Sequence, residues 1–317
     1  MTALANLPFL LFCLGAALGA AGHRISIPTD ASSWLGTLLV VLLGLKGGLG
    51  LATATSLADV TPALAAGLGC ALLVPLLVRP CLKIAGWSAE ESALAAGHYG
   101  SVSVATFLAM LSYLNSLDIA TDEYMITVMA VMEAPALVVA LVLVYRSSSA
   151  SLQLPSALRV AILNPPLLLL AGAMMVGLVL HQNPAAEPDT RAVLQWIPGL
   201  LSVYLLLLGQ KAGGLLRRGG VRPPDVVFAV ISPLVFGALG LMLGSLLGLS
   251  HGNSALLAVL VGSASYIVAP AVLSQVMPHV GLERTQVMVI GVTFPVNLLV
   301  AIPLWAALAP AMPRAIF

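Results

Sequence analysis

The sequence predicts an all-α polytopic membrane protein with ten transmembrane helices, arranged as two inverted repeats of five helices. The first reason is composition: 60% of the 317 residues are hydrophobic and only 8% are charged, whereas a soluble domain carries about 25% charged residues. The second reason is a series of ten apolar segments long enough to cross a bilayer. The third reason is a set of internal sequence matches at a nearly constant separation.

The composition also excludes several classes of function. The net charge of +1 gives no reason to expect a nucleic-acid partner. The chain has no HExxH, phosphate-loop or paired CxxC motif, so we predict no catalytic residue, no transition-metal site and no organic cofactor. The three cysteines, Cys13, Cys70 and Cys81, lie in or beside apolar segments and are expected to be small core residues.

Each predicted span is a run of about 20 mostly apolar residues. The first five spans cover Leu7–Ala21, Trp34–Ala52, Thr61–Val78, Glu91–Asn115 and Glu123–Tyr145. The second five cover Ala161–Leu180, Leu194–Gly209, Val226–Leu249, Ser254–Met277 and Gln286–Ala309. The first run has no basic residue before Arg24, so it is expected to be a retained helix and not a signal peptide. The first repeat is therefore placed at residues 1–146, a short cytoplasmic linker at 147–159 and the second repeat at 160–317.

Basic residues set the predicted orientation. With the loops assigned alternately to the two faces, ten of the 13 lysines and arginines fall on one face, and only Arg191 and Arg314 fall on the other. The basic face is predicted to be cytoplasmic. Both termini then lie outside the cytoplasm, in a protein of the plasma (bacterial inner) membrane. Because five spans per half is an odd number, the second half enters the membrane in the opposite sense, and an internal repeat must be inverted.

Three internal matches indicate such a repeat. The matched pairs are 42–51 with 207–216, 97–106 with 262–270, and 132–135 with 292–295. The first pair is identical at six of ten positions, and the first two pairs share an offset of 165 residues. Leucine and glycine are common in an apolar chain, so one match would mean little. Three matches in the same order indicate a repeat.

The second matched pair interrupts the fourth and ninth spans with small polar residues. Glycine and serine are poor residues for the centre of a continuous helix. An interruption at that depth must be buried in protein or line a water-filled cavity. Half-helix N-termini favour an anion, whereas unwound carbonyls and hydroxyls suit a small cation. Close helix packing is the alternative for a single cluster, but an inverted pair indicates a substrate site. The predicted substrate-binding residues are Gly100, Ser101, Val102, Ser103, Ser263, Ala264, Ser265 and Tyr266.

The fifth and tenth spans carry the third matched pair. Glu133 lies well inside the fifth span, where an ionisable group is costly and is by default a functional hypothesis. It lies beside a proline, and the matching Pro295 is flanked by Thr293 and Asn297. Each proline exposes a helical carbonyl, although a simple kink is the alternative for Pro295 alone. The predicted sodium-binding residues are Ser103, Thr106, Glu133, Ser265, Thr293 and Asn297.

Other titratable residues in the spans have simpler explanations. Lys46 and Lys211 lie beside glycines toward the ends of their spans, where a lysine reaches the interface. His98 is a candidate proton carrier, but a single histidine beside a glycine is more often a hydrogen-bonded structural residue. Glu133 has the alternative of a buried pair with Lys46 or His98.

Five segments in the same order resemble motifs of the sodium-dependent bicarbonate transporter family, the SbtA-like permeases. These segments are 44–48, 99–107, 132–137, 263–270 and 291–297. The resemblance implies a core domain from spans 3–5 and 8–10, in which the discontinuous fourth and ninth spans cross, and a gate domain from spans 1, 2, 6 and 7. It also implies a homotrimer, elevator-type movement, sodium as the coupling ion, and a PII-like (SbtB-type) cytoplasmic regulator.

The chain departs from the cyanobacterial members of that family in three places. Tyr266 stands where they have an aspartate, Glu133 replaces a different acid, and the linker at 147–159 is much shorter. From the residues and the resemblance together we expect sodium-coupled symport of a small anion, with bicarbonate as the first choice. The alternatives are a proton-coupled carrier of a small organic anion, with Glu133 or His98 titrating, and a membrane sensor or docking protein that does not transport.

Overall fold

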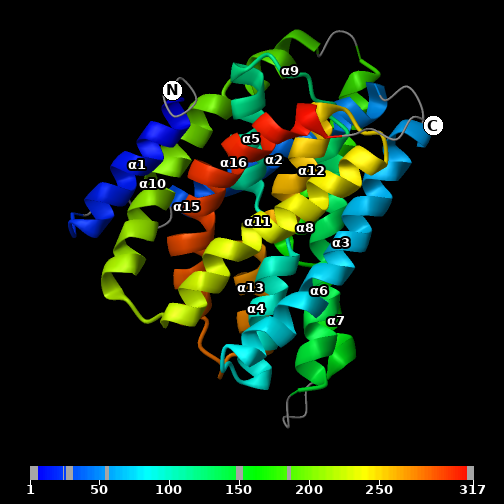
Figure 1. Cartoon of the computed structure of the whole chain (residues 1–317). Coiled ribbons are helices and arrows are strands. Elements are labelled where there is room, and N and C mark those ends of the chain that lie inside the picture. The colour runs from blue at the N-terminus through cyan, green and yellow to red at the C-terminus, as the bar shows by residue number, and fades with distance from the viewer. Residues whose placement is uncertain are drawn as a thin grey trace.

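The computed structural model describes residues 6–23, 25, 31–53, 57–147, 153–183 and 187–312. Arg24 and Arg314, which the orientation prediction uses, and residues 148–152 of the predicted linker lie outside these ranges. Every regular element within them is a helix. The start of α1 and the end of α16 lie at the same face of the molecule (Figure 1).

The elements in chain order are α1 (Leu7–Ala20), α2 (Ala31–Thr53), α3 (Leu57–Ile84), α4 (Ala89–Gly100), α5 (Val104–Ser116), α6 (Met125–Tyr145), α7 (Leu154–Ile162), α8 (Pro165–His181), α9 (Glu187–Leu194), α10 (Ile197–Arg218), α11 (Pro223–Leu246), α12 (His251–Gly262), α13 (Val268–Val276), α14 (Glu283–Gln286), α15 (Phe294–Val296) and α16 (Ile302–Leu308). Two π-helical stretches, Val287–Thr293 and Asn297–Ala301, join the last three helices into one segment.

Seven helical segments of the described chain are long and apolar enough to cross a membrane, with α4 and α5 counted as one segment. The pair α7 and α8, bent by 41°, would make an eighth. Helices α1 and α12 are apolar but shorter, at 14 and 12 residues. The all-α polytopic membrane class is thereby confirmed, and the number of ten spans stays a prediction.

The segment predicted as a linker at 147–159 is partly helical. Helix α7 begins at Leu154, with Pro155 in its first turn, where proline costs no hydrogen bond. Ala157 and Ala161, four residues apart, are the buried residues of this helix, which packs against α6. That contact with α6 makes the helix part of the fold.

Helix α10 continues beyond the predicted end of the seventh span at Gly209 and reaches Arg218. Glycines such as Gly213 usually weaken a helix interior. Here Gly209 and Gly213 face the backbone of α1, where a Cβ would lie 2.2 Å from the Phe12 carbonyl oxygen and 2.1 Å from that of Ala16. The glycines therefore allow a close helix contact, and the helix does not end at them.

Helices α2 and α8 pack in the same way. A Cβ on Gly48 would lie 2.0 Å from the carbonyl oxygen of Met174, and one on Gly177 would lie 2.3 Å from that of Leu45. Gly44 also faces α8, and a Cβ there would lie 2.7 Å from the carbonyl oxygen of Leu170. The two sequence runs that match at an offset of 165 residues, 42–51 and 207–216, therefore supply equivalent glycine contacts in two different helix pairs.

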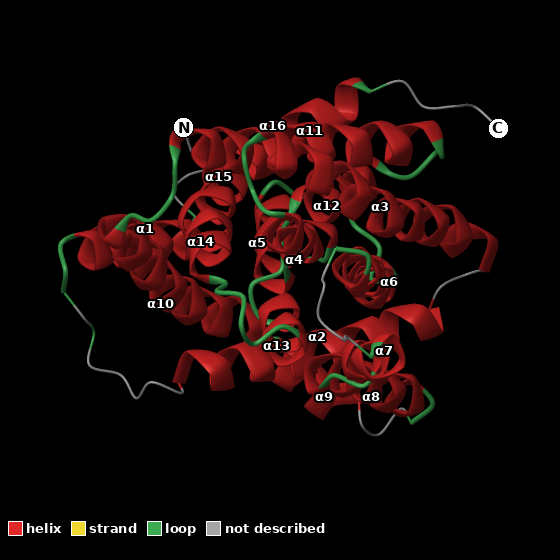
Figure 2. Ribbon diagram, turned by 90° about the horizontal axis from the view of Figure 1, so that it is seen from below, coloured by secondary structure: helices red, strands yellow, loops and turns green. Residues whose placement is uncertain are grey.

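Helices α4 and α5 lie in the middle of the molecule, with the α1–α10 pair to one side (Figure 2). Helix α4 packs against α3 and α6, and α12 packs against α11 and α5. At one face this central group is held by Asp225, which is fully buried and accepts hydrogen bonds from Trp87 and Arg284 at 2.6–2.9 Å. At the opposite end of α4–α5, Asn253 donates to Asp122 at 2.6 Å. Polar contacts therefore join the group near both faces.

Candidate functional site

The fourth predicted span is interrupted where the sequence predicted. Helix α4 ends at Gly100, α5 begins at Val104, and the backbone between them is extended at Ser101 and Ser103. A Cβ on Gly100 would lie 2.2 Å from Cγ of Pro75 in α3, so only glycine fits there. The Ser103 hydroxyl caps α5. It accepts from the backbone N–H and hydroxyl of Thr106, at 3.2 and 2.8 Å.

The ninth predicted span has an equivalent interruption. Helix α12 ends at Gly262 and α13 begins at Val268. The Ser265 hydroxyl accepts from the backbone N–H of Ala269 at 3.2 Å, and the amide of Asn297 donates to the carbonyl of Gly262 at 3.0 Å. Counted from helix end to helix end, Gly100 and Gly262, the two interruptions lie 162 residues apart and not 165. The separation predicted from the sequence match therefore differs from the observed one by less than one helical turn.

The two interruptions contact each other directly. The backbone N–H of Ser103 donates to the Ser263 hydroxyl at 3.0 Å. The backbone N–H of Ser265 donates to the carbonyl of His98 at 2.8 Å, and Nδ1 of His98 lies 2.8 Å from the carbonyl oxygen of Ser265. Since a carbonyl oxygen can only accept, His98 carries a proton on Nδ1. The crossing of the fourth and ninth spans is therefore a hydrogen-bonded contact.

Glu133 of α6 is 3% exposed and belongs to the same cluster. Its Oε1 accepts a hydrogen bond from the Ser101 hydroxyl at 2.7 Å. The alternative of a buried pair between Glu133 and Lys46 is wrong. Lys46 pairs instead with Glu123, with 3.6 Å between Nζ and Oε1. The carboxylate of Glu133 thus adds a buried oxygen pair beside the first interruption.

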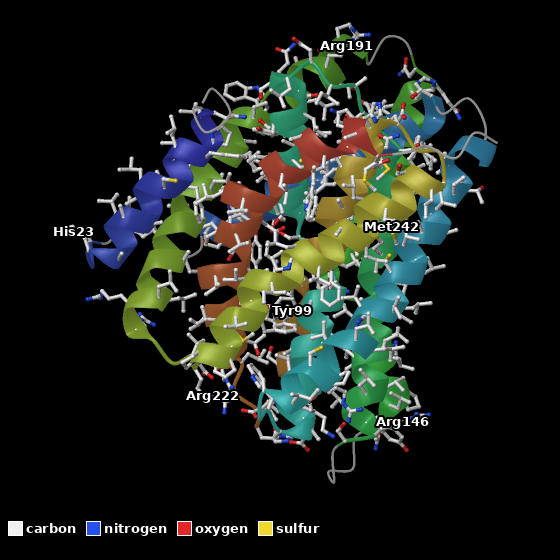
Figure 3. All side chains as sticks on the ribbon, in the orientation of Figure 1. His23, Tyr99, Arg146, Arg191, Arg222 and Met242 are labelled. Carbon is white, nitrogen blue, oxygen red and sulfur yellow. The ribbon has the colours of Figure 1, made fainter. Side chains whose placement is uncertain are left out.

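Pro295 lies between the two π-helical stretches of the last segment, a distortion that frequently marks functional sites. Asn297 contacts the second interruption through Gly262, as described above. Thr293 is placed differently. Its hydroxyl donates to the carbonyl of Ala229 at 2.9 Å and lies 2.8 Å from the hydroxyl of Tyr99, the residue in the middle of Figure 3. The Thr293 hydroxyl thus bonds to α4 and α11 and not to the serines of the crossing.

Tyr266, 8% exposed, lies in the second interruption with its ring edge-on to Phe294 at 5.6 Å between centroids. Its hydroxyl is buried without a hydrogen-bond partner among the described residues. The same holds for Oδ1 of Asn297 and Nε2 of His98. Buried polar atoms are nearly always satisfied. Three such atoms on residues at one crossing indicate a place where a ligand or water completes the hydrogen bonding.

His98 is the hydrogen-bonded structural residue that the sequence favoured, and only the identity of its partner was not predicted. It is fully buried and joins α4 to the second interruption by two hydrogen bonds, one from its side chain and one from its backbone. A lone histidine beside a glycine gave no signal of this contact, because the partner Ser265 is 167 residues away. The remaining predicted residues, Gly100, Val102, Ala264 and Thr106, are all buried in or beside the two interruptions.

Replacement of His98 by phenylalanine is expected to loosen the crossing. It leaves the Ser265 carbonyl without its donor, and an unsatisfied buried acceptor costs about 1–3 kcal/mol. The melting temperature of the purified protein in detergent should fall. His98→Asn, which can place an N–H near the position of Nδ1, should retain most of the stability. Equal loss in both variants would contradict this role, because it would mean that ring volume and not the donor matters.

The apolar helices define the class of protein: a multi-pass membrane protein, here with a buried polar crossing. The chain belongs to the Na⁺-dependent bicarbonate transporter superfamily, whose family model matches residues 8–310, and it is therefore a membrane permease and not an enzyme. No curated protein matches the chain at a significant level. The family resemblance noted in the sequence is thereby confirmed over nearly the whole chain.

Proposed function

We propose that the protein is a secondary active transporter that couples the uptake of bicarbonate to sodium by elevator-type alternating access. The observation that carries the proposal is the contact of two interrupted helices in the middle of the molecule, where four serines, Glu133 and three unpartnered polar atoms gather. Interrupted spans with helix ends at mid-membrane are typical of secondary transporters. The family to which the chain belongs supports sodium and bicarbonate as the pair of ions.

The residues at the crossing suit both ions. The proposed substrate site comprises Gly100, Ser101, Val102, Ser103, Ser263, Ala264, Ser265 and Tyr266. Serine and tyrosine hydroxyls donate to the oxygens of an anion, and the N-terminus of α5 adds the positive end of a helix. The proposed sodium ligands are Ser103, Thr106, Glu133, Ser265, Thr293 and Asn297, which offer the oxygen atoms that a hard cation prefers. Among the hydroxyls of this set, that of Ser103 has the fewest free lone pairs, because it already accepts two hydrogen bonds from Thr106.

The proposed movement divides the helices into two groups. The gate would comprise α1, α2 and the α7–α10 region, in which the glycine contacts of α1–α10 and α2–α8 hold the helix backbones close together. The core would comprise α3–α6 and α11–α16. The contacts around Asp225 and Asn253 support this division, because they join core helices to one another near both faces. Two five-helix inverted repeats and ten spans belong to the same proposal, as do a homotrimer and a PII-like regulator.

The proposal is tested by uptake of labelled bicarbonate into cells that express the protein, with and without an inward sodium gradient. Sodium is expected to raise the initial rate at least tenfold, and choline in place of sodium should abolish the increase. Small carboxylates serve as competing substrates. Equal uptake without sodium would contradict the coupling, and absence of any uptake would contradict transport of bicarbonate.

A second candidate, a proton-coupled carrier of a small organic anion, is favoured by one observation. His98 and Glu133 are both buried at the crossing, and Nε2 of His98 has no partner among the described residues. Such a carrier would be driven by a pH gradient in the absence of sodium, and Glu133→Gln would abolish that uptake. Uptake of labelled small carboxylates into the same cells, driven by a pH gradient or by a sodium gradient, distinguishes the two candidates.

A further inference from the structure

Two neighbouring cavities lie at the face of the molecule that carries Arg191 (Figure 3). The larger has a volume of about 430 Å³ and is lined by α2, α5, α9 and α10, with Lys46, Ser112 and Arg191 among its residues. The smaller, of about 270 Å³, also includes Lys46 and Glu123 and adds Asp122. The side chains of Lys46 and Glu123 are 25% and 44% exposed, so water reaches them.

The larger cavity follows one face of α5 toward the crossing. Its lining includes Leu108, Ser112 and Asn115, which are three to four residues apart and so share a helix face. Helix α5 begins at Val104, immediately after the first interruption. Leu108, about one turn into α5, is therefore the innermost lining residue on this helix. The cavity thus lies between the Arg191 face and the site proposed above, in contact with helices of both the proposed gate and the proposed core.

The charges in the two cavities are unequal. The lining of the larger cavity includes two cations, Lys46 and Arg191, and one carboxylate, Glu123. The smaller contains Lys46 against Glu123 and Asp122, but the carboxylate of Asp122 already accepts a hydrogen bond from Asn253 at 2.6 Å. The Lys46–Glu123 pair is 3.6 Å long, whereas charge-assisted hydrogen bonds measure about 2.7–2.9 Å. Such a loose, partly exposed pair is weak, so Lys46 can exchange Glu123 for another anion.

We propose that the larger cavity is an outer vestibule that binds the transported anion before it reaches the crossing. Lys46 is the binding residue, and Glu123 is the counter-ion that the anion displaces. The ligand class is a small oxyanion with one negative charge. This inference rests on the proposed function, because it assumes that the anion travels to the crossing from the Arg191 face.

The first test is the concentration dependence of bicarbonate uptake into intact cells. Lys46→Met is expected to raise KM about five- to tenfold with little change in maximal rate, since one favourable charge is lost before the transport step. Glu123→Gln is expected to lower KM about two- to threefold, because Lys46 is released from its partner. Lys211→Met is the matched control: this exposed lysine occupies the equivalent position in the matched run on α10 and should leave KM unchanged.

Two outcomes of this test overturn the proposal. One is an unchanged KM in Lys46→Met. The other is a Glu123→Gln variant that needs more sodium for half-maximal uptake at unchanged KM for the anion, which would make the vestibule a cation site. If the unsubstituted protein takes up no bicarbonate, the proposed function has failed. Anion binding in the vestibule is then tested by a second measurement that needs no transport.

That second measurement uses Ser112→Cys in a chain whose three natural cysteines are replaced by alanine. The thiol lies in the lining of the cavity, and its rates of reaction with an anionic and a cationic methanethiosulfonate reagent report the local potential. Adding Lys46→Met should lower the ratio of anionic to cationic rates at least about threefold, as expected for a charge at close range in water. The proposal of an anion-binding vestibule would be overturned if the thiol reacted with neither reagent. It would also be overturned if Lys46→Met left the ratio of the two rates unchanged.

Discussion

Replacement of Glu133 by glutamine is expected to reduce sodium-driven bicarbonate uptake about ten- to a hundredfold at limiting sodium. The substitution keeps the size of the side chain and an acceptor for the Ser101 hydroxyl, which now lies 2.7 Å from Oε1. It removes the negative charge beside the proposed cation site. A hydrogen bond or contact to a charged group contributes about 1.5–3 kcal/mol, and each 1.4 kcal/mol is a factor of about ten in affinity. The sodium concentration for half-maximal uptake should rise accordingly.

Two control variants separate charge from structure at this position. Ser101→Ala removes the hydrogen bond and leaves the charge, so its effect on the sodium requirement should be much smaller than that of Glu133→Gln. Glu133→Asp keeps the charge with a shorter side chain and should retain part of the sodium response. The role is contradicted if Glu133→Gln folds, transports and shows the sodium dependence of the unsubstituted protein.

Gly213→Ala is expected to have the largest effect on stability. A Cβ at this position would lie 2.1 Å from the carbonyl oxygen of Ala16, a backbone atom that cannot rotate away. Helices α1 and α10 must therefore separate, and overpacking of this kind costs about 3 kcal/mol. The variant should show a lower melting temperature in detergent and a smaller folded fraction after size-exclusion chromatography.

The adjacent Gly214 provides the matched control. No atom lies within 4 Å of a Cβ built there, so the same substitution meets open space. Because alanine is the better helix former by about 1 kcal/mol, Gly214→Ala should be neutral or stabilising. Similar losses in both variants would show that backbone flexibility of α10, and not its contact with α1, explains the glycines.

Much of the site could be predicted because its signals are local in the chain. The serines and glycines at 100–103 and 262–265 disfavour a continuous helix whatever surrounds them, and the structure has an interruption at both places. Glu133 was identified because a charged side chain well inside a membrane span is energetically costly. Glu123, the partner of Lys46, was not predicted, because only the packing of α2 against the start of α6 brings the two side chains together.

By itself, the sequence determined the membrane class, the interrupted helices, the matched runs and the family, since composition, residue preferences and spacing suffice for these. Only the tertiary structure decided which residues meet. It joined His98 to Ser265, directed Thr293 to Tyr99 and Ala229, and set Gly213 but not Gly214 against a neighbouring backbone. The physical reason is that such contacts join residues far apart in the chain, and they depend on how whole helices pack, which no local pattern of residues specifies.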